Sequence, residues 1–331
     1  TFGIASPEVS SVSVGVALLR DGCETPQDLF RAADLALFHA KHNGRGQYAV
    51  FDPERDGSWS ERLDLEAQLR GAVGRNEFHL RFQPIVSLTD ERLTAVEALV
   101  RWEHPVRGVI LPTAFIPLAE ESGMIPEIGR WVLTESCRQL VAWDQQFGSG
   151  GPGVDYISVN VSAAELRDPA YVERVAQVLR ETGTDPTRLQ LEITESLIIE
   201  EGQESLERLN ELKELGIRLA IDDFGTGYSS LSYLTRMPVD ILKVDRSFVG
   251  HMLDSERVAS VVRATISLAH ALDMRVVAEG VETVEQQHAL RDLGCELAQG
   301  YLYARPLTAE GVVAYLDECC GEPLTKADDA A

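Results

Sequence analysis

The sequence lacks two features that would tie it to a membrane. No window holds the roughly 18 uninterrupted apolar residues of a spanning helix, and no charged-then-apolar leader stands at the N-terminus. We therefore expect no membrane contact within this chain. The chain begins at Thr1 and not at Met, so we expect sequence upstream, where any membrane anchor of the full-length protein would lie.

Cysteine is scarce as well. The five cysteines are Cys23, Cys137, Cys295, Cys319 and Cys320, an odd number with no CxxC spacing among them. This pattern does not indicate a disulfide framework, and it predicts reduced thiols in a cytoplasmic protein.

Basic residues are few relative to acidic ones. The chain has 30 Lys and Arg against 53 Asp and Glu, a formal net charge of −23. Proteins that bind nucleic acid polymers use Lys and Arg to replace counterions, so this charge argues against such a partner. It does not exclude a small phosphate ligand held by metal ions.

The 331 residues suffice for one large domain, or for a large domain with a small one. Residues 1–52 predict strand, helix and strand over 11–17, 26–42 and 47–51. Fifty residues make a poor core, so we expect this small α+β piece to be the end of a larger domain. A linker follows over 53–76, with a helix from Ser58 to Val73.

The longer remainder alternates strands with helices. We expect strands over 79–86, 94–102, 156–162, 189–195, 218–224, 241–247, 275–281 and 297–303, with helices between them, for example over 126–146, 202–215, 254–272 and 283–293. About eight such repeats call for a closed barrel or a doubly wound sheet, and polar residues at most strand ends favour the barrel. The fold class is therefore α/β, a modified TIM-type (β/α)8 barrel over 77–318, followed by a disordered tail over 319–331.

The first two strands depart from an ordinary barrel. Only Ser87 to Leu93 separates them, which is too short for the crossover that a parallel pair needs. We therefore expect the first strand to be antiparallel, so that the barrel opens with a hairpin.

Polar residues gather at the strand ends: Glu97, Asn160, Glu192, Asp222, Asp223, Lys243, Glu279 and Gln299. The adjacent carboxylates of Asp222 and Asp223 follow an apolar run and precede a glycine-rich turn, where a cation would offset their repulsion and desolvation. An oxygen-rich set of this kind suits Mg²⁺ or Mn²⁺ and does not suit structural Zn²⁺. The pattern predicts a metal-dependent enzyme.

Each of these residues also has a structural interpretation. A single strand-end carboxylate is usually solvated or caps a helix, and Asp222-Asp223 also fits a turn motif. Lys243 could pair with Asp245, while Glu279 and Glu282 could cap the helix near Thr283. The chance that structural reasons of this kind apply independently at all these strand ends is small.

The ordered series of motifs resembles one known family. Glu97-Ala98-Leu99-Val100-Arg101-Trp102 resembles the signature of the EAL domain, a bacterial phosphodiesterase that opens cyclic di-GMP to linear pGpG. The likeness runs from about residue 77 to 314, through Gln83-Pro84-Ile85, Asn160-Val161-Ser162, Glu192-Ile193-Thr194-Glu195, Asp222-Asp223-Phe224-Gly225-Thr226-Gly227, Lys243-Val244-Asp245, Glu279-Gly280-Val281-Glu282-Thr283 and Gln299-Gly300-Tyr301.

The resemblance implies a role for each matching position. Two ions, Mg²⁺ or Mn²⁺, would be held by Glu97, Asn160, Glu192 and Asp222 on one side and by Asp222, Asp223 and Glu279 on the other, and would activate a water for in-line attack. Lys243 would orient that water, Gln299 would position substrate or water, and Glu282 would act indirectly. Glu195 would hold the loop after Asp223 in shape. The substrate contacts would come from Gln83, Leu99, Arg101, Asn160, Asp245 and Gln299.

The resemblance also implies a homodimer formed through helices beside that loop. Residues 1–52 are similar to the C-terminal end of a GGDEF domain, the diguanylate cyclase fold, through Ala32-Ala33-Asp34-Leu35-Ala36-Leu37, Ala40-Lys41 and Gly44-Arg45-Gly46. The GGDEF signature itself is absent, so we expect this fragment to have no cyclase site.

Two other functions remain open at this point. A cyclic di-GMP receptor would keep the barrel and lose metal ligands or the loop glutamate, whereas every motif position named above holds the expected residue. A barrel hydrolase of another phosphate ester would keep the metals and change the substrate side, which here also matches the family.

Overall fold

The computed structural model describes residues 12–18, 25–42, 46–52, 62, 64–147, 153–225 and 234–319. It divides the chain into two compact units, Thr1–Gly71 and Ala72–Ala331. This division after Gly71 does not test the domain limits predicted at residues 52 and 76, which remain predictions.

In the smaller unit two short strands pair in parallel across a helix. These are β1 (Val14–Val16), α1 (Pro26–His42) and β2 (Tyr48–Val50), as the sequence predicts. The hydroxyl of Thr25 accepts a hydrogen bond from the backbone N–H of Asp28 and so begins α1. Gly15 lets strand and helix touch, because a Cβ there would lie 2.1 Å from the carbonyl oxygen of Ala33.

The linker helix ends earlier than predicted. Residues 64–69 are helical and a turn follows over 70–76, whereas the predicted helix extends to Val73. The predicted start at Ser58 lies outside the described residues.

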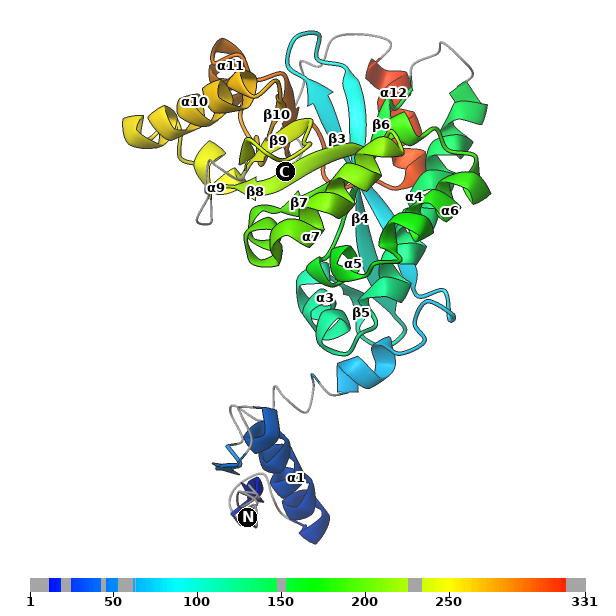
Figure 1. The fold of residues 1–331 in the computed structure, drawn as a ribbon, viewed down its shortest axis with the longest axis vertical. Coiled ribbons are helices and arrows are strands. Elements are labelled where there is room, and N and C mark those ends of the chain that lie inside the picture. Colours follow the sequence, from blue (N-terminus) through cyan, green and yellow to red (C-terminus); the bar gives the residue numbers. More distant parts are fainter. Residues whose placement is uncertain are drawn as a thin grey trace, which may run out of the picture. The chain divides into compact units, whose positions relative to one another are not determined.

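Eight strands of the larger unit close into a barrel (Figure 1). In chain order they are β3 (Phe78–Ser87), β4 (Leu93–His104), β6 (Tyr156–Asn160), β7 (Leu189–Thr194), β8 (Arg218–Phe224), β9 (Ile241–Val244), β10 (Arg275–Ala278) and β11 (Leu297–Gln299), and the short β5 (Gly108–Ile110) pairs with β4 outside the ring. β3 pairs antiparallel with both β4 and β11, while the remaining neighbours in the ring are parallel. The predicted barrel with an antiparallel first strand is confirmed.

Helices follow the strands. They are α3 (Pro112–Glu121), α4 (Ile125–Phe147), α5 (Ala163–Arg167), α6 (Tyr171–Thr182), the 3₁₀ turn η1 (Pro186–Arg188), α7 (Glu195–Glu214), α9 (Arg246–Val249), α10 (Glu256–Ala271), α11 (Val284–Asp292) and α12 (Ala309–Cys319). Two begin with a capping box: Ser162 with Glu165 in α5, and Thr283 with Gln286 in α11.

Several predicted boundaries are wrong. The strands predicted over 156–162, 241–247, 275–281 and 297–303 end earlier, at Asn160, Val244, Ala278 and Gln299, and residues 246–247 already belong to α9. The helix after β7 starts at Glu195, seven residues before the expected start at residue 202, because the strand passes into the helix at Thr194 without a loop. Cys319, expected in the tail, is the last residue of α12, and residues 320–331 lie outside the described part.

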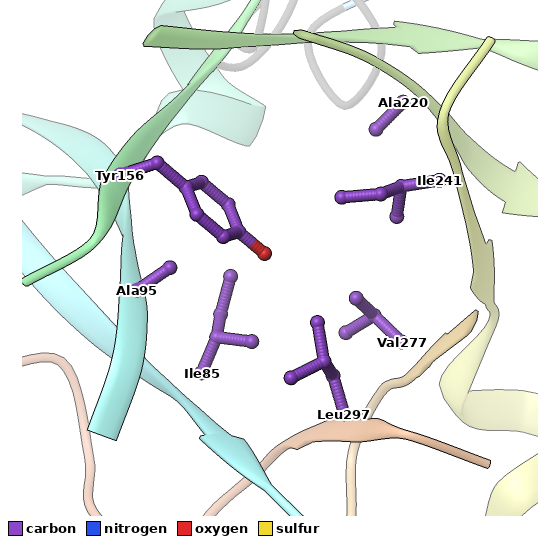
Figure 2. Close-up of a cluster of buried hydrophobic side chains, with 7 residues drawn as sticks. All are labelled: Ile85, Ala95, Tyr156, Ala220, Ile241, Val277 and Leu297. Atoms are coloured by element: carbon purple, nitrogen blue, oxygen red, sulfur yellow. The ribbon is translucent and has the colours of Figure 1, made fainter. Parts of the chain in front are cut away.

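At one end of the barrel, the strands bury apolar side chains on both of their faces, outward against the helices and inward in the lumen. The outward Leu189, Leu191 and Ile193 of β7 are buried against the surrounding helices. Inside, seven buried residues from seven strands meet: Ile85, Ala95, Tyr156, Ala220, Ile241, Val277 and Leu297 (Figure 2). We call these seven residues the barrel floor; because they fill the lumen, they leave the opposite, C-terminal end of the parallel strands for chemistry.

Two further expectations from the sequence concern membrane-spanning helices and the state of the cysteines. No helix among the described residues is long and apolar enough to cross a membrane. Cys137 and Cys295 are free and buried, as expected for reduced thiols, and burial raises their pKa to about 11 and about 12.

The barrel floor yields a stability prediction. Ile241 is 2% exposed and belongs to the barrel floor, so Ile241→Ala removes buried methyl groups and leaves a cavity. Urea denaturation should give a free energy of unfolding lower by about 2–5 kcal/mol. Val261→Ala on α10, 41% exposed, is the control and should change it by about 0.5 kcal/mol or less. Equal losses in both variants would contradict this packing.

Candidate active site

Above the barrel floor the lumen turns from apolar to ionic. The side chains that alternate inward on β4, β7, β8 and β9 change from Ala95, Gln190, Ala220 and Ile241 to the residue two positions later on each strand. Those later residues are Glu97, Glu192, Asp222 and Lys243. The strand register therefore places several titratable groups at one end of the barrel.

Lys243 stands at the centre of this acidic cluster. Its Nζ lies 2.7 Å from Glu192 Oε2, 2.7 Å from Glu279 Oε1, 3.1 Å from Asp222 Oδ1 and 3.6 Å from Glu97 Oε2. The lysine is 1% exposed. The cluster is thus four carboxylates around one buried ammonium, with an excess of negative charge when all are ionised.

Burial and mutual charge decide the ionisation of the cluster. Burial would lower the pKa of Lys243, but the surrounding carboxylates outweigh it and raise that pKa well above its ordinary value. Burial raises the pKa of Glu279 to about 8, and it holds the pKa of Glu192 well above the ordinary value even though Lys243 opposes it. A bound cation would favour the ionised carboxylates, so the cluster is suited to one.

Glu97 is held by neutral donors on both of its oxygens. The amide of Asn160 donates to Oε1 at 2.7 Å and the amide of Gln299 donates to Oε2 at 2.6 Å. Burial would raise the pKa of Glu97, but Lys243 and these two donors outweigh it, so its pKa lies below the ordinary value. Glu97 therefore stays ionised in the barrel.

A second group of oxygens lies beside Lys243. Asp222, Asp223 and Glu279 each offer a carboxylate oxygen, and these atoms lie within 4.8 Å of one another. Burial and the charge of Asp222 raise the pKa of Asp223. Closely spaced carboxylate oxygens are the ligand set that Mg²⁺ and Mn²⁺ prefer, so the residues present fit a divalent cation.

The backbone is strained where these carboxylates meet. Asp223 has φ of +55°, a left-handed value uncommon for a residue with a side chain. Gly225 has φ of +98°, and a Cβ there would lie 2.9 Å from the ring of Phe248. The buried Glu195 accepts a hydrogen bond from the Gly225 N–H at 3.0 Å, so the first residue of α7 ties down this turn. Residues 226–233 of the loop lie outside the described part.

Three predicted substrate residues lie beside the cluster. Gln83 pairs in register with Glu97 and donates its amide to the carbonyl oxygen of Ala304. Arg101 donates to the carbonyl oxygen of Val100 at 2.9 Å, and burial together with the charge of Arg81 lowers its pKa. Leu99 lines a cavity of about 430 Å³.

That cavity is mainly apolar and reaches the predicted site. Its wall includes Ile116 of α3, Ile128 of α4 and Val161, and it extends to Asn160 and Thr194 at the ends of β6 and β7. A hollow of this size beside the carboxylates has room for part of a ligand.

Two predicted site residues are placed outside the acidic cluster. Asp245 caps α9, where its Oδ1 accepts from the backbone N–H of Ser247 at 3.0 Å. Glu282 is exposed, and its backbone N–H donates to Gln286 at 2.8 Å. Two of the structural interpretations are also decided. In the described part of the chain Lys243 pairs with the cluster and not with Asp245, and Thr283, not Glu279 or Glu282, caps α11.

Sequence reasoning did not select Ser158 and Gln190. Ser158 donates to Glu192 Oε1 at 2.6 Å, and Gln190 Nε2 donates to Ser158 Oγ at 2.7 Å. The sequence does contain a signal for both residues. Ser158 stands two positions before Asn160 and Gln190 two positions before Glu192, each on the inward side of an apolar strand.

This arrangement agrees with a known family. The EAL domain model matches residues 66–306. The chain belongs to the EAL domain family. MucR of Pseudomonas aeruginosa, a bifunctional diguanylate cyclase/cyclic di-GMP phosphodiesterase, is 41% identical over 304 residues, which cover 92% of this chain and 44% of MucR.

One other similar protein and a solved structure support the EAL assignment. NbdA of P. aeruginosa, a cyclic di-GMP phosphodiesterase, is 40% identical over 308 residues, covering 93% of this chain and 39% of NbdA. A solved structure of the PaMucR phosphodiesterase in complex with c-di-GMP has a TM-score of 0.71 and 41% identity, and the match covers 75% of this chain and 99% of that one. The chain spans less than half the length of MucR and of NbdA.

The central ion cluster yields a second prediction. Lys243→Met leaves its carboxylate partners without a cation, so in EDTA the free energy of unfolding should fall by about 3–5 kcal/mol. Urea denaturation measures the loss, and added Mg²⁺ should recover part of it. The control Lys213→Met removes the half-exposed pair with Asp240 and should cost about 1 kcal/mol or less. A Lys243→Met loss as small as the control would contradict the central role of this lysine.

Proposed function

We propose that this EAL domain hydrolyses cyclic di-GMP to linear pGpG with two divalent cations, Mg²⁺ or Mn²⁺. The observation that carries the proposal is the excess of buried carboxylates around one lysine at the open end of the barrel. The names of MucR and NbdA and the ligand of the PaMucR structure support the substrate.

The chain offers ligands for two ions. Glu97, Asn160, Glu192 and Asp222 would hold one, and Asp222, Asp223 and Glu279 the other. When bound, the ions would lower the pKa of a water molecule and shield the charge of the phosphodiester. Asp222 belongs to both sets, so its replacement should affect both.

The remaining residues would bind substrate and move protons. Lys243 Nζ, already bonded to the carboxylates, would orient the attacking water and balance the charge of the cluster; because the raised pKa keeps it an ammonium, an ionised carboxylate beside it would accept the proton of the water. Gln299 and Glu97 would fix the water from the opposite side. Arg101 would neutralise a phosphate, and the cavity beside Leu99 has room for part of the nucleotide.

The rest of the proposal concerns binding and assembly. Asp245 and Gln83 would contact substrate, Glu282 would act indirectly, and Glu195 would couple the order of the loop to metal binding. The domain would act in the cytoplasm as a homodimer. The N-terminal unit would be the end of a GGDEF domain without a cyclase site.

The competing function is a cyclic di-GMP receptor with little turnover. The observation against it is that the ligand positions and the loop glutamate Glu195 are all present, with Glu195 bonded to Gly225. A receptor would bind the nucleotide and leave it intact, which separates the two functions in one assay.

The test is incubation of the purified chain with cyclic di-GMP and Mg²⁺ or Mn²⁺, followed by chromatography for pGpG. We expect pGpG with either metal and none in EDTA. Asp222→Asn should lower turnover at least about 100-fold, because it removes a ligand of both ions. Asp292→Asn, on the exposed end of α11, is the matched control and should keep full turnover.

Two results would contradict the proposal. Intact nucleotide that still binds the wild-type chain would indicate the receptor. Normal turnover by Asp222→Asn would remove the two-metal assignment.

A further inference from the structure

The carboxylate of Glu192 is held from two sides. On one side Oε2 lies 2.7 Å from Lys243 Nζ. On the other side Oε1 accepts from Ser158 Oγ at 2.6 Å and from Gln190 Nε2 at 3.3 Å, while Gln190 Nε2 also donates to Ser158 at 2.7 Å. The three bonds on the Oε1 side form a closed triangle of neutral donors around one oxygen.

The triangle lies between the barrel floor and the acidic cluster. Ser158 follows the floor residue Tyr156 by two positions on β6, and Gln190 precedes Glu192 by two positions on β7. Ser158 and Gln190 are both 0% exposed. The floor takes its residues from the seven other strands (Figure 2). On β7 the inward residue next to this apolar layer is the amide Gln190.

Stability alone does not account for this amide. Among the described residues Gln190 Oε1 has no hydrogen-bond partner, and neither has the hydroxyl of Tyr156, which points towards the centre of the barrel in Figure 2. A buried polar atom without a partner destabilises a protein, and an apolar side chain of similar shape at position 190 would avoid that loss. Sites where a local rule is broken in this way are often functional.

The geometry explains what the triangle does. A carboxylate can rotate about its Cγ–Cδ bond, and only one of its orientations directs Oε2 to Lys243 and the predicted ion. Donors fixed on Oε1 select that orientation. Partners of this kind orient metal ligands in many proteins.

We propose that Ser158 and Gln190 are positioning residues that hold Glu192 in the orientation in which it binds the divalent cation. This inference rests on the proposed function, because it assumes that Glu192 is a metal ligand. Neither residue would touch the substrate.

The test measures metal binding without turnover. Mn²⁺ is titrated into the metal-free chain, and the electron paramagnetic resonance signal of free Mn²⁺ gives the Kd. Ser158→Ala and Gln190→Met should each raise the Kd about 10-fold or more. Gln190→Met should also melt at or above the wild-type temperature, because it removes the unpartnered oxygen.

The matched control is Ser136→Ala on α4. Ser136 is also 0% exposed, and its hydroxyl has no partner among the described residues. This variant should keep the wild-type Kd. It separates the loss of a buried serine from the loss of the bond to Glu192.

The outcomes separate this inference from the proposed function. A lower melting temperature of Ser158→Ala and Gln190→Met with an unchanged Kd would mean a structural role and overturn the inference alone. A wild-type chain that binds no Mn²⁺ would overturn both. A raised Kd in both variants, with wild-type binding in Ser136→Ala, would support the inference.

Discussion

The structure depends on the attraction between one buried ammonium and the carboxylates around it. Lys243 is 1% exposed and lies within 3.6 Å of four carboxylates. Charges removed from water destabilise a fold unless they are paired. Because four carboxylates surround one lysine, the pairing is incomplete when all of them are ionised, and the proposed function assigns the remaining negative charge to divalent cations.

The barrel supplies the geometry that this attraction needs. Inward side chains of neighbouring strands fall into layers, so a step of two residues takes each strand from the apolar floor to the ionic level. The floor excludes water from one end and leaves the other for a ligand. Neutral amides and hydroxyls then fix individual carboxylates, as Asn160 and Gln299 do for Glu97.

Much of this could be predicted from the sequence. Strand ends rich in Glu, Asp and Lys indicated the site, and the short link after Ser87 predicted the antiparallel hairpin. Other features depend on contacts between distant residues. The bonds from Ser158 and Gln190 to Glu192 need the β6–β7 register, and the start of α7 at Glu195 needs the direct passage from strand to helix. The sequence did not predict that Asp245 caps α9. Lys243 and Asp245 alternate onto the same strand face, so both were expected to belong to one site.

The proposed function requires that the excess acid around Lys243 binds two divalent cations. Crystals of the chain soaked in Mn²⁺ and measured for anomalous scattering test this directly. We expect two peaks, one among Glu97, Asn160, Glu192 and Asp222 and one among Asp222, Asp223 and Glu279. Crystals with Mn²⁺ bound elsewhere, and no peak within this cluster, would contradict it.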